Sequence, residues 1–335
     1  MTVAAFLLRR FGATVLLLIV ISFVTFSLFQ FGPADPAAAA CGQECTPQRI
    51  AEARVALGMD KPFLTQYLTY MSGLFHGRTV GAPGAQSLCQ WPCFGKSFQT
   101  NEDVTAVLER ALPYTVSVAV GAIVLWTVAG VTLGTLAALR KNKLTDKAIV
   151  GAASIGVSLP IPVTGLLLLL VFVSTFDLLP FTTNAITSPF GPAGFGGWFQ
   201  NYLLPWIALA VLFSAQYIRV TRSSMLETFG EDFMRTARSK GLSRTAMVVR
   251  HGARAGLTPV VTMLGLDIGL LLGGAVLTEQ IFSVPGVGFT AVRAAQAGDL
   301  PVTMAITLLA AFFVIVANVV VDAVYTVIDP RVRAA

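Results

Sequence analysis

The sequence predicts an all-α membrane protein with six transmembrane helices and a large external loop after the first helix. Of its 335 residues, 55% are hydrophobic and only 12% are charged, whereas ordinary soluble domains carry about 25% charged residues. The apolar residues form long runs that can cross a bilayer as helices. Most arginines and lysines fall in alternate polar segments, so the net charge of +6 reflects membrane topology rather than a nucleic-acid surface.

The first predicted span is residues 11–31, directly after Arg9 and Arg10. A cleaved signal peptide is the alternative, because four alanines precede Cys41. The apolar run exceeds the roughly 7–15 residues of a signal-peptide core, which favours a membrane span. Residues 32–113 then form an external loop in which three short helices are expected. One begins at Thr46 and Pro47 and ends at Gly58, and the apolar faces of the others are Leu64, Tyr67, Leu68, Met71 and Phe75, and Val104, Val107, Leu108 and Leu112.

All four cysteines, Cys41, Cys45, Cys89 and Cys93, lie in this external loop. An even number of cysteines on the oxidising side of a membrane predicts disulfides, and four cysteines allow three pairings. Bridges between the first pair and the second are favoured, because closing a long loop removes more entropy from the unfolded chain. Two local bridges, a zinc site of four thiolates, and free thiols are the alternatives. No metal site is assigned, since the two histidines lie far apart in the sequence.

The second span contains Gly130-x-x-x-Gly134, a small-residue face that permits close helix packing. The third span contains Pro160 and Pro162, which predict a kink because proline removes a backbone hydrogen bond. Both chain termini are expected on the cytoplasmic side. The five spans after the first are predicted at residues 114–139, 148–176, 202–218, 260–278 and 302–327.

A strongly basic segment, residues 219–257, separates the fourth and fifth spans, and we call it the basic loop. Its charge excludes it from hydrocarbon and predicts a cytoplasmic position. Phe229, Phe233 and Ala237 recur at helical spacing. Gly241 suits the left-handed residue that ends a helix, and Ser243 suits the N-cap of the next one. The pattern therefore predicts a helix–turn–helix that is tied at both ends to membrane spans.

The basic loop resembles the cytoplasmic coupling loop of ABC-importer permease subunits, whose general pattern is E-A-A-x-x-x-G. Only Ala237 and Gly241 match that pattern. The form RTARSKGL at residues 235–242, and the long distance from Gly241 to Pro259, are similar to the dipeptide, oligopeptide and nickel branch of the family. The segments QYLTYMSGLFHG and LERALPYT resemble the same family, and EQIFSVPGVGF resembles the turn after the fifth span throughout ABC-importer permeases. The resemblance covers nearly the whole chain except the cysteine-bearing insertions.

This resemblance implies a single transmembrane domain, residues 1–335, of the type I ABC-importer permease kind. It implies a subunit that forms half of a peptide translocation pathway across the cytoplasmic membrane. The implied partners are a second homologous permease in a heterodimer, two ABC ATPases that carry ATP and magnesium, an extracytoplasmic substrate-binding protein and the lipid bilayer. No cofactor is expected in this chain. The residues implied to contact the ATPases are Glu231, Asp232, Phe233, Arg235, Thr236, Ala237, Arg238, Lys240 and Gly241.

Asp267, in the fifth span, is the main candidate for the translocation pathway. An ionisable group inside a membrane faces a cavity or a partner by default. Asp267 lies about 200° around the helix from the stripe of Gly265, Gly269 and Gly273. A structural hydrogen bond is the alternative for Asp267, as it is for Asp322 in the sixth span. The kink at Pro160 and Pro162 is likewise either part of the pathway or a static feature.

The sequence contains no credible nucleophile and base, so a transport subunit is expected rather than an enzyme. The G-K-S at residues 95–97 lacks the earlier glycine of a phosphate-binding loop, since Gln90 stands there. Within the same role, nickel chelates or haem-like compounds are alternative cargoes. A self-sufficient proton-coupled transporter that uses Asp267 is a further alternative, although such transporters usually contain internal repeats. A membrane-embedded enzyme is disfavoured.

Overall fold

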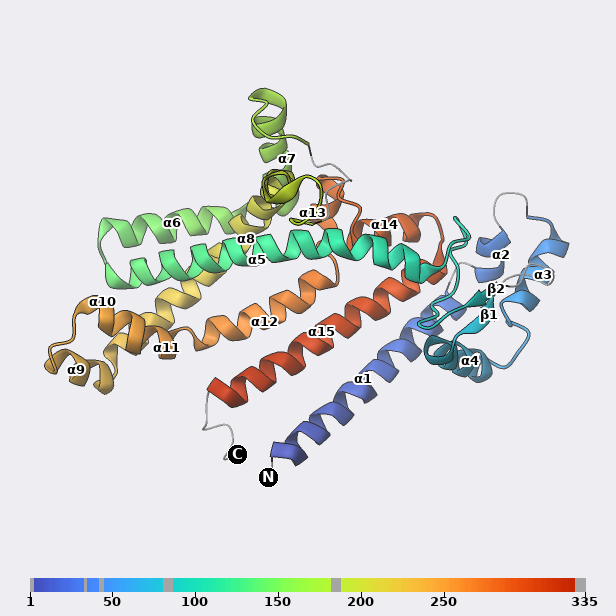
Figure 1. Cartoon of the computed structure of the whole chain (residues 1–335), viewed down its shortest axis with the longest axis horizontal. Coiled ribbons are helices and arrows are strands. Elements are labelled where there is room, and N and C mark those ends of the chain that lie inside the picture. Colours follow the sequence, from blue (N-terminus) through green and yellow to red (C-terminus); the bar gives the residue numbers. More distant parts are fainter. Residues whose placement is uncertain (1–2, 33–34, 42–44, 81–86, 182–187, 329–335) are drawn as a thin grey trace. The chain divides into compact units, whose positions relative to one another are not determined.

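The computed structural model describes residues 3–32, 35–41, 45–80, 87–181 and 188–328. Nearly all of the described secondary structure is helical, and its strands form one two-stranded hairpin (Figure 1). Contacts divide the chain into two compact units. Unit 1 contains residues 1–115, 272–276 and 285–315, and unit 2 contains residues 116–271, 277–284 and 316–335.

Unit 1 begins with the long helix α1 (Val3–Phe31), which contains the first predicted span. Two short helices follow, α2 (Pro36–Cys41) and α3 (Pro47–Ala56). The predicted limits of α3 are confirmed. Thr46 accepts the backbone N–H of Arg49 at 3.3 Å, and Gly58 has a φ of +68° just after the helix. Helix α4 (Phe63–His76) then leads into the antiparallel hairpin of β1 (Arg78–Val80) and β2 (Ser87–Cys89).

The core of unit 1 is formed by the start of α5 (Val104–Leu139) together with α14 (Val287–Gln296) and α15 (Leu300–Ile328). The predicted third loop helix and the second span are one continuous helix, α5, with Pro113 inside it. The prediction of two elements was wrong, because a single missing backbone N–H does not end so long a helix. The buried core residues are Val104, Leu108, Ala111, Val287, Ala294, Val302, Ala305 and Ile306.

The G-K-S segment has a structural role in unit 1. Ser97 donates a hydrogen bond to the Asp299 carboxylate, and Asp299 also accepts the backbone N–H of Phe98 at 3.1 Å. Gln99 donates to the carbonyl oxygen of Ala297 at 2.7 Å. Residues 97–99 are therefore fastened to the turn just before α15.

In unit 2, the third predicted span is broken. Helix α6 (Leu144–Ser158) is followed by α7 (Ile161–Leu168) and a π-helical turn (Leu169–Thr175), and the two halves meet at 100°. Pro160 precedes the first residue of α7, and Pro162 lies in its first turn, where proline is tolerated. The prolines thus begin a new helix rather than kinking a continuous one.

Helix α8 (Gly194–Gly230) is much longer than the fourth predicted span and continues into the basic loop. Glycines on α5 face it, as predicted for Gly130 and Gly134. A Cβ at Gly130 would lie 2.3 Å from the Tyr217 side chain, and one at Gly134 would lie 2.6 Å from the Thr221 side chain. Trp206 of α8 also donates to the carbonyl oxygen of Ser117 on α5 at 2.9 Å. The two helices therefore pack with their backbones unusually close.

The fifth predicted span is shorter than expected. Helix α12 (Thr258–Leu272) follows a helical segment, Met247–Gly256, at an angle of 54°, and α13 (Val276–Ile281) is a separate short helix. By length and composition the described chain has four helices that can cross a membrane, or up to six if each bent pair is one span. The side chain of Asp322 and residues 329–335 lie outside the described part of the chain.

The disulfide pairing differs from the favoured prediction. Cys41 bonds to Cys45 and Cys89 bonds to Cys93, each with Cα atoms 5.5 Å apart. That separation lies within the usual range for disulfides. Each bridge joins cysteines four residues apart, so the folded chain realises the local alternative rather than the pairing that unfolded-chain entropy favours.

Candidate functional site

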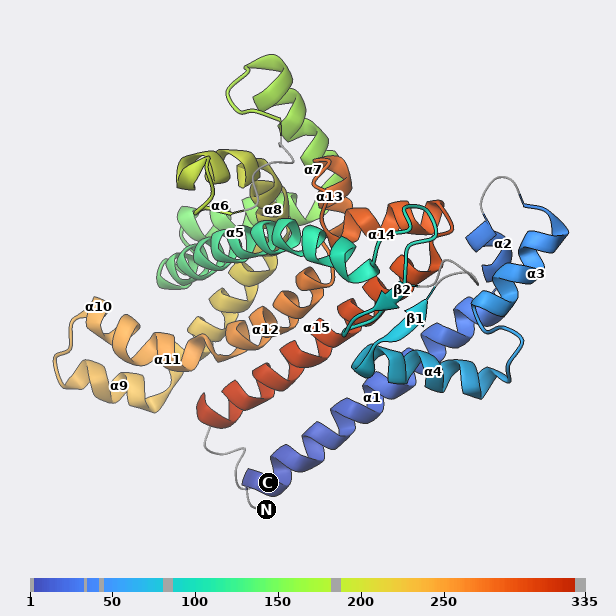
Figure 2. The same cartoon turned by 45° about the vertical axis from the view of Figure 1, so that its right-hand side comes forward.

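The basic loop folds as a helical hairpin at one end of unit 2 (Figures 1 and 2). Helix α8 ends at Gly230, and Glu231 adopts an extended conformation before helix α9 (Asp232–Ser239). The return arm contains α10 (Arg244–Ala246), a π-helical turn (Met247–Gly252) and α11 (Ala253–Gly256). Helix α12 follows at once. The hairpin thus lies between α8, a candidate membrane helix, and α12, which forms a candidate span only as a bent pair with Met247–Gly256.

Gly241 ends helix α9 in the predicted way. Its φ is +74°, the left-handed region that favours glycine. Its backbone N–H donates to the carbonyl oxygen of Arg238 at 3.0 Å, and that of Leu242 donates to the carbonyl oxygen of Ala237 at 3.4 Å. These two bonds satisfy carbonyl groups that the helix end leaves free. A Cβ at Gly241 would meet open space, so the backbone conformation alone requires glycine there.

Ser243 begins the return arm. Its side-chain oxygen accepts the backbone N–H of Ala246 at 3.3 Å, which confirms it as the N-cap. Only Leu242 stands between this cap and Gly241, so the turn is short. The turn therefore joins the two arms through the backbone hydrogen bonds after α9 and the Ser243 cap.

The buried face of the hairpin differs from the predicted one. Met234, Ala237 and Met247 form its small core, and Phe229 packs against them from the end of α8. Phe233 is exposed instead. Phe229 and Phe233 were expected on one helix, but α8 ends between them at Gly230. The break at Glu231 turns α9 so that Met234 takes the inward position.

Apart from Ala237, which is buried, every predicted coupling residue is exposed. Arg235 donates to the Asp232 carboxylate at 3.3 Å within the same helix, and both side chains are well exposed. Such a pair contributes little to stability and leaves both charges accessible to a partner. The exposed coupling residues are Glu231, Asp232, Phe233, Arg235, Thr236, Arg238, Lys240 and Gly241.

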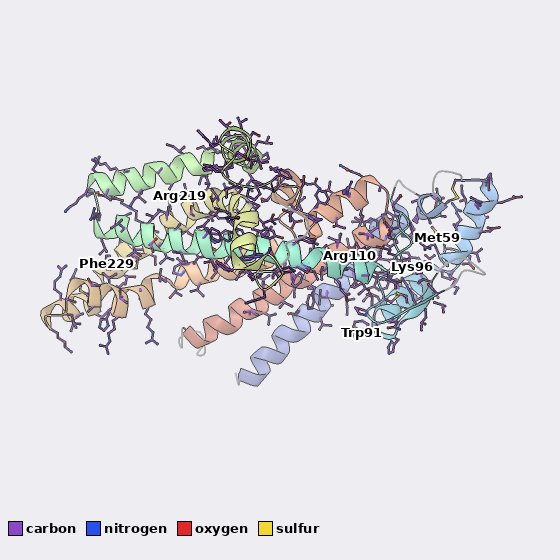
Figure 3. All side chains as sticks on the ribbon, turned by 45° about the horizontal axis from the view of Figure 1, so that its top comes forward. Met59, Trp91, Lys96, Arg110, Arg219 and Phe229 are labelled. Atoms are coloured by element: carbon purple, nitrogen blue, oxygen red, sulfur yellow. A yellow bond between two sulfur atoms is a disulfide. The ribbon has the colours of Figure 1, made fainter. Side chains whose placement is uncertain are left out.

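The base of the hairpin is packed against the neighbouring helices of unit 2. Met225 of α8 is fully buried with Val248 of the return arm and Ala138 of α5. A Cβ at Gly256 would lie 2.4 Å from the Met225 sulfur, so α11 also approaches α8 closely. Figure 3 labels Phe229 at this end of α8 and Arg219 farther along the helix. The hairpin is therefore an extension of the α5–α8 packing rather than a free loop.

An ion pair that the sequence analysis missed lies beside this base. Arg222 on α8 binds Asp146 on α6 through two hydrogen bonds, of 2.6 and 2.8 Å. Asp146 also accepts the backbone N–H of Asn142 at 2.9 Å. Only 5% of the Asp146 side chain is exposed. The signal in the sequence was a single acid in the basic segment 140–147, but nothing there identified Arg222 as its partner.

The candidate pathway residues Asp267, Pro160 and Pro162 do not meet in one contact. Tyr217 on α8 donates a hydrogen bond to Asp267 on α12, with 2.6 Å between the oxygens. The Tyr217 ring is fully buried and lies near the Trp126 ring. Asp267 is therefore held by a neighbouring helix, which is the structural alternative stated for it. Pro160 and Pro162 belong to the break between α6 and α7 and are not part of this contact.

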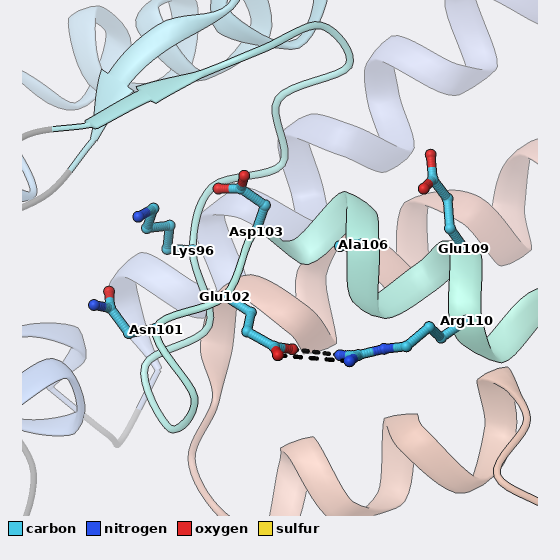
Figure 4. A pocket seen from close by; sticks show the side chains of 7 residues that line it. All are labelled: Lys96, Asn101, Glu102, Asp103, Ala106, Glu109 and Arg110. Atoms are coloured by element: carbon cyan, nitrogen blue, oxygen red, sulfur yellow. Dashed lines mark hydrogen bonds and ion pairs between the residues drawn. The ribbon is translucent and has the colours of Figure 1, made fainter.

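A pocket of about 520 Å³ lies in unit 1, at the start of α5 (Figure 4). Arg110 pairs with Glu102 across it. The pocket is open, its charges are mixed, and its residues form none of the predicted sites. It is lined by Lys96, Asn101, Glu102, Asp103, Ala106, Glu109 and Arg110.

Comparison with known proteins bears directly on the hairpin. The sequence pattern of the binding-protein-dependent transport system inner membrane component matches residues 130–334, which include the whole basic loop. The pattern of the N-terminal part of such components matches residues 3–119. The chain belongs to this family.

Its relatives are similar along their full length. The dipeptide transport system permease protein DppB of Escherichia coli K12 is 35% identical over 348 residues, which cover 98% of each chain. A protein of Sinorhizobium fredii named as a probable peptide ABC transporter permease is 34% identical over 328 residues, which cover 98% of this chain and 99% of that one. The family member described here is thus an ABC-importer permease component of the inner membrane with several spans, not an enzyme.

Proposed function

We propose that this chain forms half of the translocation pathway of an ATP-driven peptide importer, and that the basic loop couples it to the ATPases. The observation that carries the proposal is the packed helical hairpin between α8 and α12, with its exposed charged and apolar side chains. A short helix with exposed apolar and charged residues is suited to a groove on another protein. Phe233 supplies an apolar contact, and Arg235 and Arg238 supply positive charge.

The partners follow from this role. A second, homologous permease completes the pathway as a heterodimer, two ATPases carry ATP and magnesium, and an extracytoplasmic binding protein delivers cargo. The chain itself carries no cofactor. The basic loop and both termini lie in the cytoplasm, because basic segments are retained on that side. When ATP draws the two ATPases together, the hairpin moves with them, and α8 and α12 carry the movement into the membrane.

Peptides are the proposed cargo because both of the relatives described above are named as peptide or dipeptide permeases. Nickel chelates and haem-like compounds are the alternatives in the same role. A lone proton-coupled transporter is the less favoured function, since it leaves the exposed hairpin without a purpose.

The test is reconstitution with the partner subunits and the binding protein in liposomes, with uptake of a labelled dipeptide and ATP hydrolysis measured together. We expect uptake to require ATP and all subunits. Gly241→Val should reduce both activities, because a residue with a Cβ in the left-handed region costs roughly 1–2 kcal/mol and tilts the turn. The matched control is Gly58→Val, which places the same strain at a φ of +68° in open space within the external segment.

Gly58→Val should leave uptake near the wild-type rate. Equal uptake by wild type and Gly241→Val, with the ATPases still bound, would remove the coupling role of the hairpin. Proton-driven uptake by the chain alone would remove the proposed function itself.

A further inference from the structure

Helix α4 has a broad apolar face. At 100° per residue, its apolar and aromatic side chains fall within an arc of about 160°, and its serine and threonine side chains fall on the other side. Its 14 residues include no lysine, arginine or carboxylate. The apolar side chains are Phe63, Leu64, Tyr67, Leu68, Tyr70, Met71, Leu74 and Phe75.

One edge of this face packs against α1. The Tyr67 ring lies 5.2 Å from the Phe23 ring, and the Phe63 and Tyr70 rings each lie 5.6 Å from the Phe26 ring, all measured between centroids. Figures 1 and 2 both show α4 beside the C-terminal half of α1. The contact is aromatic and its Tyr67 and Tyr70 side chains are buried, so it fixes α4 on the surface of α1.

The position of this contact along α1 is informative. The Tyr67 hydroxyl oxygen lies 2.7 Å from the Ser22 side-chain oxygen and 3.3 Å from the carbonyl oxygen of Ile19. Ile19 is in the middle of the candidate span Gly12–Phe31, about 18 Å along the helix from its end at Phe31. The apolar part of a bilayer is about 30 Å thick, so nearly the whole span is needed to cross it. A helix bonded to this point cannot stand clear of the membrane.

The other side of α4 is covered by the β-hairpin. The Arg78 guanidinium lies over the Tyr70 ring at 5.0 Å, and a Cβ at Gly73 would lie 2.7 Å from the Arg78 side chain. The β-hairpin and α1 cover the half of the apolar arc that contains Tyr70, Phe63 and Tyr67, so the other half, next to the polar side of the helix, faces outward in the described structure. Leu64, Leu68 and Phe75 there are 60%, 56% and 66% exposed.

We propose that α4 is embedded in the leaflet that surrounds the C-terminal half of α1, with Leu64, Leu68 and Phe75 among the lipid acyl chains. Lipid is the occupant because α4 is bonded to the middle of the span α1, which exposes apolar side chains beside that contact, at Phe23 and Val20. Thr65 and Thr69, on the polar side, lie toward the head groups. This is the geometry of an interfacial amphipathic helix. With the proposed topology, the leaflet is the outer one.

Residues 32–113 were predicted to lie wholly outside the membrane, whereas the proposed position places α4 within the outer leaflet. There α4 is an anchor that holds the β-hairpin against the membrane surface. On its polar side, the Thr69 side chain donates to the carbonyl oxygen of Thr65 at 2.7 Å, so this hydroxyl is satisfied within the helix.

The experiment places a nitroxide label on single introduced cysteines in the full chain, assembled with its partner permease and ATPases in phospholipid nanodiscs without binding protein. The four native cysteines are held in disulfides and do not react without reductant. Power saturation compares collisions with oxygen, which concentrates in acyl chains, and with a water-soluble nickel chelate. Leu68→Cys is the test site, Thr69→Cys is its matched neighbour on the polar side, and Val20→Cys is the reference within the span.

We expect the label at Leu68 to resemble that at Val20, with oxygen collisions exceeding nickel collisions, and the label at Thr69 to show the reverse. Nickel access at Leu68 equal to that at Thr69 would show α4 to be in water and overturn the proposal. Protection of Leu68 from both reagents would show a protein cover and overturn it too. The pair Leu64→Cys and Thr65→Cys repeats the comparison one turn earlier, in case either first variant fails to assemble.

Discussion

Asp267 shows how one contact changes the interpretation of a residue. A carboxylate inside a membrane helix is costly unless it is paired or faces water. Tyr217 supplies a hydrogen bond of 2.6 Å from a neighbouring helix, so the carboxylate has a partner within the chain. A bonded carboxylate keeps further acceptor capacity, however, and can still attract the ammonium group of a peptide. The structural and transport roles of Asp267 are therefore compatible, and an experiment can distinguish them.

We expect Asp267→Asn to change the relative uptake of cationic and anionic peptides while keeping the complex intact. The asparagine carbonyl oxygen still accepts from Tyr217, so stability should fall by less than about 1.5 kcal/mol. Tyr217→Phe is the control, because it removes the donor and keeps the charge. It should lower thermal stability more and leave the charge preference unchanged. Identical charge preferences in wild type and Asp267→Asn would leave Asp267 with a structural role only.

At the scale of elements, the contact between α6 and α8 links the base of the basic loop to the broken third span. Arg222 lies on α8 eight residues before that helix ends, and Asp146 lies in the first turn of α6. A different face of α8, which carries Tyr217 and Thr221 about 100–140° around the helix from Arg222, is held to α5 by the close approaches at Gly130 and Gly134. Movement of the hairpin would therefore be shared by three helices rather than carried by α8 alone.

Asp146→Asn should destabilise unit 2 appreciably. Removing one partner of a fully buried ion pair costs about 3–5 kcal/mol. Since 27% of the Arg222 side chain is exposed, we expect roughly 2 kcal/mol here. The measurement is thermal unfolding of the purified chain in detergent, followed by helical circular dichroism. Asp35→Asn, which breaks the well-exposed pair with Arg54, is the control and should cost no more than about 1 kcal/mol. Equal losses in the two variants would contradict the importance of the buried pair.

At the scale of the whole molecule, both disulfides are confined to the segment between α1 and α5. Local bridges stiffen two short stretches and leave the chain between them uncrosslinked. Each closes a loop of only a few residues, so the entropic stabilisation is smaller than that of bridges between the two pairs.

The pairing can be tested by trypsin, which cleaves after Arg54 and Arg78, between the two cysteine pairs. We expect maleimide to label the native chain only after reduction. After cleavage without reductant, the peptides that contain Cys45 and Cys89 should separate on a denaturing gel, because no bridge joins them. Peptides that stay linked until reduction would instead support bridges between the pairs. Labelling without reductant would contradict both pairings.

The sequence alone was sufficient for the features that depend on local chemistry. Long apolar runs and alternating basic segments determined a helical membrane protein, because lipid demands satisfied backbone groups. Gly241 and Ser243 determined the turn of the basic loop, because a left-handed backbone and an N-cap each need particular residue types. The glycines of α5 indicated close helix packing. The resemblance of the basic loop to importer permeases led to the correct family, because that pattern also depends on particular residue types at fixed spacing.

Only the tertiary structure decided which side chains meet. The partner of Asp146 is 76 residues away and that of Asp267 is 50 residues away, and sequence spacing carries no information about such distances. Phe233 faces outward because α8 ends at Gly230 and α9 starts at a new angle, which the helical spacing of apolar residues does not reveal. In the same way, periodicity identified the apolar face of α4, but only packing on α1 determined which half of that face remains free.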